Sequence, residues 1–157
     1  MATRESINAK IPSNDELQAW ANDSERAQEN LRGLLAAIEA GQEESANWAT
    51  EALENMGPPS ASDIGLLGSL ASSRSADLVY WSVTLLARCD DFIDSIQDDL
   101  AKVVVAEEST APVRRRAMTA LAKVRSRNAS TESAIQSATS SSDSQLANLA
   151  KEILQPV

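Results

Sequence analysis

The chain of 157 residues contains no histidine, so the commonest general base and the commonest metal ligand are missing. Its one cysteine, Cys89, excludes an internal disulfide and a cysteine-based zinc site. Because no histidine can activate the thiol, we expect Cys89 to be structural. The sequence also lacks a glycine-rich loop with the spacing and the lysine of a phosphate-binding loop. We therefore expect a protein that is not an enzyme, without catalytic residues, a cofactor or a metal.

Aromatic residues and strand-like segments are also scarce. Aromatic side chains make up 3% of the chain, and no stretch alternates β-branched and polar residues as a strand does. We expect the three tryptophans to lie in the core, whereas Tyr80, beside Trp81, could project outward. The sequence has no signal-type apolar segment at its N-terminus and no apolar run long enough to cross a bilayer. These absences predict an all-α, cytoplasmic protein that does not contact membranes.

The charge of the chain is unbalanced. Its 14 basic and 23 acidic residues give a formal net charge of −9. An acidic protein repels polyanions, which argues against nucleic acid and anionic lipid as partners. The hydrophobic content of 43% is typical of a soluble globular protein, and the length suits one domain with a real core.

One stretch, residues 110–124, has the complete pattern of a helix. Thr110 is placed to cap its N-terminus, and Pro112 falls in the first turn, where a missing N–H is harmless. Val113, Ala117 and Leu121 follow one another four residues apart on one apolar stripe. The small side chain of Ala117 lets a second helix approach closely, and Leu121 fills the space beside it. We expect this helix to extend to about residue 126.

The same order of residues recurs along the chain. A capping residue, an apolar residue, a small residue and a leucine repeat with a spacing of 33–35 residues. The small residues are Ala49, Ser82, Ala117 and Ala150, and the leucines are Leu53, Leu86, Leu121 and Leu154. A second helix in each unit keeps the same register through Leu34, Leu67, Leu100 and Ile135. Two helices in a period of this length indicate an α-solenoid, and the alternative is an ordinary bundle of similar helices.

The periodicity predicts roughly nine helices. Their expected ranges are 14–26, 27–40, 43–56, 61–72, 76–89, 91–107, 110–126, 130–140 and 144–155. In the sixth range, Phe92 is expected to face the core together with Ile93 and Ile96. Residues 1–12 lack a periodic apolar face and are expected to be a flexible leader, followed by a single helical repeat domain over residues 13–157. The last helix has no partner in its own unit, so it would cap the stack or form an interface.

The segment Pro112-Val113-Arg114-Arg115-Arg116-Ala117, followed by Ala120-Leu121, resembles the first helix of HEAT repeats, particularly the phycobilisome-lyase type. The units that start at Ser45, Ser75 and Asp143 match in part, because the proline and Val-Arg are replaced. The resemblance implies right-handed stacking of about four helical pairs plus a C-terminal capping helix, with the second helices lining a concave face. It also implies a role in protein–protein interaction or, as for some members, in cofactor attachment or enzyme assembly.

Carboxylates gather on the helix expected over residues 91–107. Asp94 and Asp98 lie one turn apart, following Asp90, and Asp91 and Asp99 lie beside them. Such a face could hold a cation, bind a basic partner or simply be solvated, with the first carboxylates favoured by the helix dipole. Because the helix would line the concave side, we take Asp91, Asp94, Asp98 and Asp99 as candidates for binding a basic protein segment.

A basic segment follows this acidic helix. Arg114, Arg115, Arg116, Lys123, Arg125 and Arg127 occur with no acidic residue from 109 through 131. Nucleic-acid binding is one interpretation, but the net charge and the lack of interleaved aromatic residues argue against it. Neutralisation between the two neighbouring helices is the second interpretation, and a docking patch for an acidic protein is the third. Arg114, Arg115 and Arg116 are therefore further candidates for partner binding.

Together these features predict a non-enzymatic adaptor that uses a curved, largely acidic helical surface to bind a protein partner with a basic segment. One alternative is an accessory protein in enzyme maturation or cofactor attachment, as the resemblance suggests. The other is binding of a nucleic-acid backbone through residues 114–127.

Overall fold

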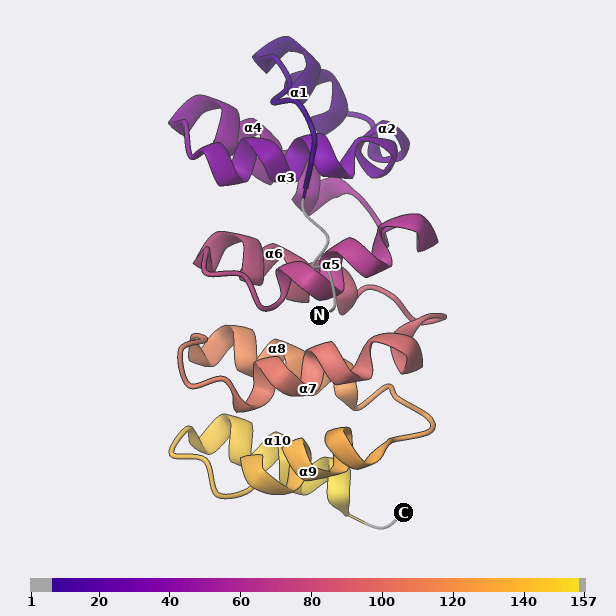
Figure 1. Cartoon of the computed structure of the whole chain (residues 1–157), viewed down its shortest axis with the longest axis vertical. Helices are drawn as coiled ribbons and strands as arrows, with labels where there is room; N and C mark the ends of the chain where they lie inside the picture. Colours follow the sequence, from indigo (N-terminus) through magenta and orange to yellow (C-terminus); the bar gives the residue numbers. More distant parts are fainter. Residues whose placement is uncertain (1–6, 156–157) are drawn as a thin grey trace.

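The structure of the protein, a computed structural model, describes residues 7–155 and is all-helical over that range. An N-terminal unit comprises α1 (Asn14–Ala21), α2 (Ser24–Glu29), α3 (Leu31–Ala40) and α4 (Glu43–Asn55). Three helical pairs follow along the long axis of the molecule (Figure 1): α5 (Ile64–Leu70) with α6 (Ala76–Leu86), α7 (Gln97–Val105) with α8 (Ala111–Leu121), and α9 (Ala129–Ala138) with α10 (Ser144–Leu154). Two 3₁₀ turns, η1 (Ala61–Asp63) and η2 (Ile93–Ile96), precede α5 and α7.

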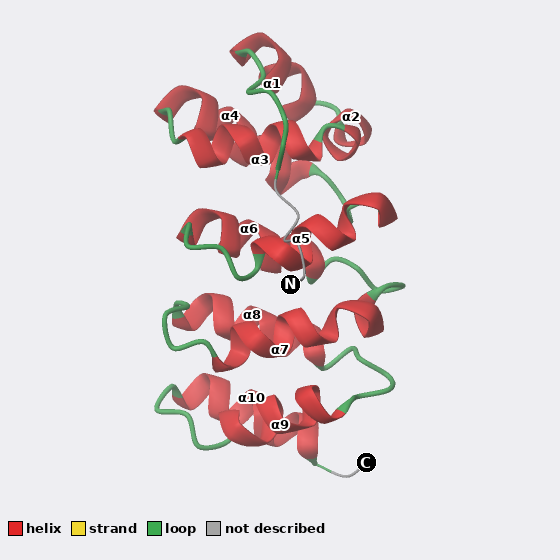
Figure 2. Ribbon diagram, viewed as in Figure 1, coloured by secondary structure: helices red, strands yellow, loops and turns green. Residues whose placement is uncertain are grey.

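Consecutive helices share a layer where they pack against each other, as α5 does with α6, α7 with α8 and α9 with α10. Residues 71–75, 106–110 and 139–143 form three five-residue loops, each inside one pair, whereas the connections between pairs run along the opposite edge (Figure 2). A short connection makes consecutive helices antiparallel neighbours. Each layer therefore joins a second helix to the first helix of the following unit, one helix out of step with the units expected from the sequence. The last helix, α10, is consequently paired with α9 and also packs on α8.

The predicted register of buried positions is confirmed. The small residues Ala49, Ser82, Ala117 and Ala150 are all fully buried. So are the second-helix residues Leu34, Leu67, Leu100 and Ile135. The packed helices join each pair to the next one, α6 to α8, α8 to α10 and α7 to α9. The apolar stripes are thus buried between neighbouring layers, where small residues permit close approach.

Two of the expected helices, 14–26 and 27–40, have different boundaries in the structure. The chain leaves α1 at Asn22, and the Asp23 side chain accepts a hydrogen bond from the backbone N–H of Arg26, which starts α2. A further break at Asn30 separates α2 from α3. Asn and Asp compete with the helix by bonding nearby backbone groups, and this local effect overrides the apolar periodicity.

Phe92 does not lie in the core. The helix expected over residues 91–107 begins only at Gln97, and the 3₁₀ turn before it places Ile93 and Ile96 inward. Phe92 precedes this turn and is 42% exposed, so its assignment to the core was wrong. A change from helical to 3₁₀ geometry shifts which residues share a face, and this explains the error.

The expected leader spans residues 1–12, of which residues 1–6 lie outside the described residues. Ile7 is buried, and Pro12 covers Gly33 of α3 together with Trp20. A Cβ atom at Gly33 would lie 3.1 Å from Pro12 Cγ, so a larger residue there would push this segment away. Ile7 and Pro12 therefore pack on the N-terminal unit, whereas residues 8–11 between them are exposed, and the flexibility of the leader stays a prediction.

The tryptophans and Tyr80, in contrast to Phe92, lie as expected. Trp81 is buried, and Trp20 and Trp48 are partly buried against the core. Tyr80 is 38% exposed and packs edge-on against Trp81, with the ring centroids 5.1 Å apart. The tryptophans thus pack in or against the core, and Tyr80 projects from α6.

Ser82 gives a direct test of the packing between layers. Its hydroxyl is buried without a hydrogen-bond partner among the described residues, at a position where other repeats have alanine. Because a buried unpaired hydroxyl loses its hydration, S82A should raise the free energy of unfolding by about 1 kcal/mol and Tm by about 3 °C. Chemical and thermal denaturation followed by circular dichroism measure both quantities.

The reciprocal substitution A117S is the matched control, because it adds the same hydroxyl at the equivalent position of α8. It should lower stability by a similar amount. A less stable S82A protein would contradict the assigned environment of this position.

Candidate partner-binding surface

Side-chain hydrogen bonds between layers join residues about one repeat apart. Arg88 Nη1 donates to the carbonyl oxygens of Leu53 (2.7 Å) and Met56 (2.8 Å), 35 and 32 positions earlier. Lys123 Nζ donates in the same way to the carbonyl oxygen of Ala87 (2.9 Å), 36 positions earlier. In both cases a cation that follows one helix satisfies open carbonyls at the C-terminal end of the equivalent helix before it. The pKa of Arg88 is lowered from its ordinary value, mainly by burial and to a smaller extent by the positive charge of Arg116.

The predicted basic candidates contact different parts of the fold. Arg114 Nε donates to the carbonyl oxygen of Val104 (2.8 Å), within its own layer. Arg115 reaches the next layer, where its Nε lies 2.7 Å and its Nη2 3.0 Å from the two carboxylate oxygens of Asp143. This two-point hydrogen bond is the main reason why the pKa of Asp143, the N-cap of α10, is lowered.

Arg116 contacts the preceding layer instead. Its Nη1 donates to Thr84 Oγ1 (2.6 Å), and its guanidinium carbon lies 5.3 Å from the centroid of the Tyr80 ring. Such a cation–π contact adds to the hydrogen bond. The three consecutive arginines therefore link three layers and do not form one basic patch.

The predicted acidic candidates have mixed surroundings. Asp94 accepts a hydrogen bond from the backbone N–H of Arg125 (3.1 Å), and Asp98 accepts one from the Asn128 side chain (2.7 Å). Asp91 is exposed and forms no hydrogen bond or ion pair among the described residues. Asp94 and Asp98 thus hold the 122–128 loop, and only Asp91 keeps its carboxylate free of the fold.

Two cations of the basic segment form ion pairs with carboxylates outside the predicted set. Lys123 Nζ lies 3.0 Å from Asp90 Oδ1, and Arg127 Nε lies 3.0 Å from Glu132 Oε1. The contact of Lys123 with Asp90 is consistent with neutralisation between the two segments, but it involves none of Asp91, Asp94, Asp98 and Asp99. Asp94 and Asp98 are instead held by neutral donors of the 122–128 loop.

The polar residue at the centre of this edge, Gln97, was not among the predicted candidates. The buried Gln97 donates from Nε2 to the carbonyl oxygen of Ser126 (3.1 Å). Its Oε1 accepts from the backbone N–H of Asn128 (2.9 Å) and from Thr131 Oγ1 (2.7 Å). The one available signal was a glutamine at a position that falls on the apolar side of its helix.

Asp99 is the fourth acidic candidate, and it faces α5. A Cβ atom at Gly68 would lie 3.1 Å from Asp99 Cγ, so the glycine makes room for this carboxylate. Desolvation by burial raises the pKa of Asp99 above its ordinary value of 3.8, against the opposing effect of Lys102. Asp99 is therefore half-buried and is less accessible to a partner than Asp91.

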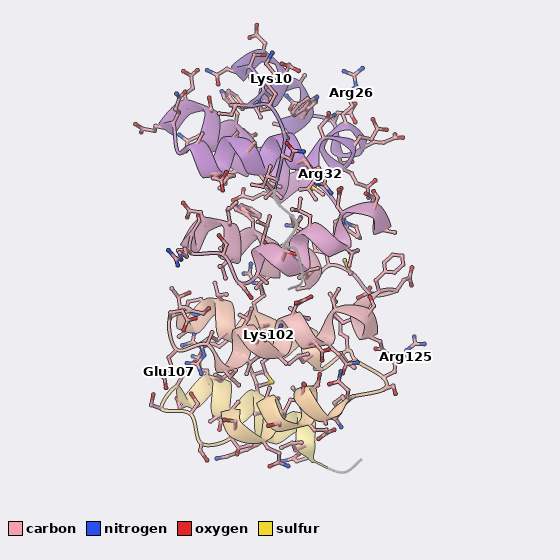
Figure 3. All side chains as sticks on the ribbon, in the orientation of Figure 1. Lys10, Arg26, Arg32, Lys102, Glu107 and Arg125 are labelled. Atoms are coloured by element: carbon pink, nitrogen blue, oxygen red, sulfur yellow. The ribbon has the colours of Figure 1, made fainter. Side chains whose placement is uncertain are left out.

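The uncompensated negative charge lies elsewhere, in the N-terminal unit. Residues 14–55 carry ten acidic and two basic side chains, a net charge of −8, whereas residues 56–157 carry twelve acidic and ten basic side chains. All ten carboxylates are exposed. The two basic residues, Arg26 and Arg32, lie near α2 (Figure 3) and contact Asp23 at 3.7 Å and Asp63 of η1 at 3.5 Å. We call the exposed carboxylates of residues 14–55 the acidic surface.

Cys89 and the remaining carboxylates show no arrangement typical of a catalytic or metal centre. Burial raises the pKa of Cys89 to about 11, so the thiol stays protonated at neutral pH. Within residues 7–155, no three His, Cys, Asp or Glu side chains converge as a metal site requires. None of the described helices combines the length and the apolar character needed to cross a membrane.

The contact between Asp99 and Gly68 predicts a pH-dependent gain in stability for D99N. Because the pKa of Asp99 is raised in the folded state, its ionised form costs stability, and this cost appears as pH rises above the ordinary value of 3.8. Asparagine keeps the shape and removes the charge. D99N should be more stable than the wild type at pH 7 by under about 1 kcal/mol, since the site is partly solvated.

Urea denaturation at pH 7 and pH 3 measures this gain. At pH 3 both proteins are uncharged at position 99, so the difference should disappear. An equal gain at both pH values would assign it to packing and contradict the charge argument.

No protein-family model, curated protein or solved structure matches the chain.

Proposed function

We propose that the protein is a non-enzymatic helical scaffold of the HEAT-like kind that binds a basic segment of a partner protein through its acidic surface. The observation that carries the proposal is the distribution of charge. One end of the stack, residues 14–55, has a net charge of −8 and few cations to compensate it. A like-charged cluster raises the energy of the free protein, and a basic partner relieves that repulsion.

The layered architecture supports a scaffold role. Side-chain ties between successive layers, such as Arg115 with Asp143 and Arg88 with Leu53, hold the stack in one register. A surface that is already ordered binds with a smaller loss of conformational entropy. Charge complementarity would then contribute mainly to the association rate and to partner selectivity.

The acidic surface is a better candidate than the α7 face that the sequence suggested. Asp94 and Asp98 already bond the 122–128 loop, so neutralising them would disturb the fold as well as any partner. The carboxylates of α2, α3 and α4 are exposed and include residues in the C-terminal halves of their helices. A negative charge at the C-terminal end of a helix interacts unfavourably with the helix dipole. These carboxylates therefore do not serve to stabilise their own helices.

The test uses the triple variant E29Q/E39Q/E51Q, which neutralises one exposed carboxylate on each of α2, α3 and α4. A partner is first captured from an extract of the source cells with the wild-type protein, identified by mass spectrometry and purified. Its association rate is then measured at several salt concentrations. The variant should associate about tenfold more slowly at low salt and should show a flatter salt dependence.

The matched control is D91N/E107Q/E152Q, which removes three exposed carboxylates outside the N-terminal unit. It should keep an association rate close to that of the wild type. If this control slowed association as much as E29Q/E39Q/E51Q, the acidic surface would not be the binding site.

A further inference from the structure

A hollow of about 400 Å³ opens between the second and third layers, beside the α5–α6 loop and the end of α7. Its floor is apolar and includes the buried residues Val79, Val103 and Val113. Its volume falls in the range of sites for small molecules. The hollow lies outside the acidic surface, so a ligand could occupy it whether or not a basic partner binds the N-terminal unit.

Two loops and small residues line this space. The helices α5 and α7 end at Leu70 and Val105, and residues of the five-residue loop after each helix line the hollow. Ala71 and Ala106, at equivalent places in successive layers, line the hollow with methyl groups only. The layers therefore separate at this edge, whereas α7 and α9 pack closely.

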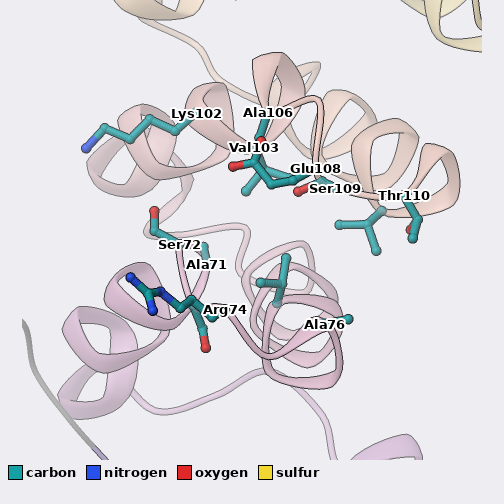
Figure 4. A pocket seen from close by; sticks show the side chains of 13 residues that line it. Ala71, Ser72, Arg74, Ala76, Lys102, Val103, Ala106, Glu108, Ser109 and Thr110 are labelled. Carbon is teal, nitrogen blue, oxygen red and sulfur yellow. The ribbon is translucent and has the colours of Figure 1, made fainter.

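The rim of the hollow carries two cations. Lys102 extends from α7 and Arg74 from the α5–α6 loop, and both side chains reach toward the same side of the hollow (Figure 4). Neither side chain forms a hydrogen bond or ion pair among the described residues, in contrast to Arg88, Arg115 and Arg116. Glu108 is the one carboxylate in the lining, so the rim has a net charge of +1.

These features select the chemistry of an occupant. An apolar floor favours an aliphatic body, and no aromatic residue in the lining offers a stacking surface for a nucleobase. Two cations favour an anionic group, and arginine in particular matches the geometry of a carboxylate. Because Glu108 repels a second negative charge, a monoanion fits better than a phosphate or a dicarboxylate.

We propose that this hollow binds a small monocarboxylate with a short aliphatic chain, whose body packs on the valine floor and whose carboxylate is bound by Arg74 and Lys102. Such a ligand touches residues of both the second and the third layer. Binding would therefore stabilise the contact between them, because a ligand that binds only the folded state raises its stability.

The test is an NMR titration of the full ¹⁵N-labelled chain with hexanoate. Saturable shifts should concentrate on residues 71–79 and 102–113. Hexanamide has the same body without the charge, and acetate has the charge without the body. Both should bind at least about fivefold more weakly than hexanoate. Equal binding of hexanamide would overturn the role of the cations.

Two double variants with the same change in net charge complete the test. R74Q/K102Q should weaken hexanoate binding on the order of fivefold. R125Q/K151Q removes two exposed cations outside the hollow and should leave the affinity unchanged. Equal losses in the two variants, or shifts spread over all exposed apolar residues, would overturn the site.

Discussion

Each pair of helices buries its apolar stripes against the pair before it and the pair after it, and the rest of the structure depends on this constraint. Ala49, Ser82, Ala117 and Ala150 are fully buried because each stands where a neighbouring helix approaches most closely. Neighbours in space are one repeat apart in sequence, so the same packing recurs along the chain. The loops at both edges stay outside this packing, and the polar contacts and the hollow lie there.

Several charged side chains join neighbouring layers. Arg115 bonds the N-cap of α10, Arg88 bonds the C-terminal carbonyls of α4, and Lys123 does the same for α6. The contacts of Arg88 and Lys123 satisfy carbonyl groups at helix ends that would otherwise lack partners. The consecutive residues Arg114, Arg115 and Arg116 therefore make separate contacts in different layers. Asp94 and Asp98 form hydrogen bonds with the 122–128 loop.

The fold could be predicted from the sequence as far as periodicity reaches. The all-α class, the buried small residues and the second-helix register follow from apolar positions spaced 33–35 residues apart. The breaks at Asn22 and Asn30 could not be predicted, because they depend on local competition between caps and helix. The exposure of Phe92 could not be predicted either, because it depends on the 3₁₀ turn before α7. The pairing of helices into layers also differed, because α5 packs on α6, α7 on α8 and α9 on α10, one helix out of step with the repeat units.

The candidate site was harder to predict than the fold. Asp94 and Asp98 are indistinguishable from free carboxylates in the sequence, and only the approach of the 122–128 loop shows that they are occupied. The acidic surface could have been found by dividing the charge along the chain, since residues 14–55 hold ten of the 23 acidic residues and two of the 14 basic ones. The hollow has no sequence signal, because its lining comes from loops and helices of two layers that meet only in the fold.

The layered packing itself is tested most directly by methyl NOE measurements on the chain with labelled alanine, isoleucine, leucine and valine. The account predicts long-range NOEs between α7 and α9 and between α8 and α10, and none that join the N-terminal unit to α9 or α10. Strong NOEs between those two ends would show that the helices close around a common core, and they would contradict the stack.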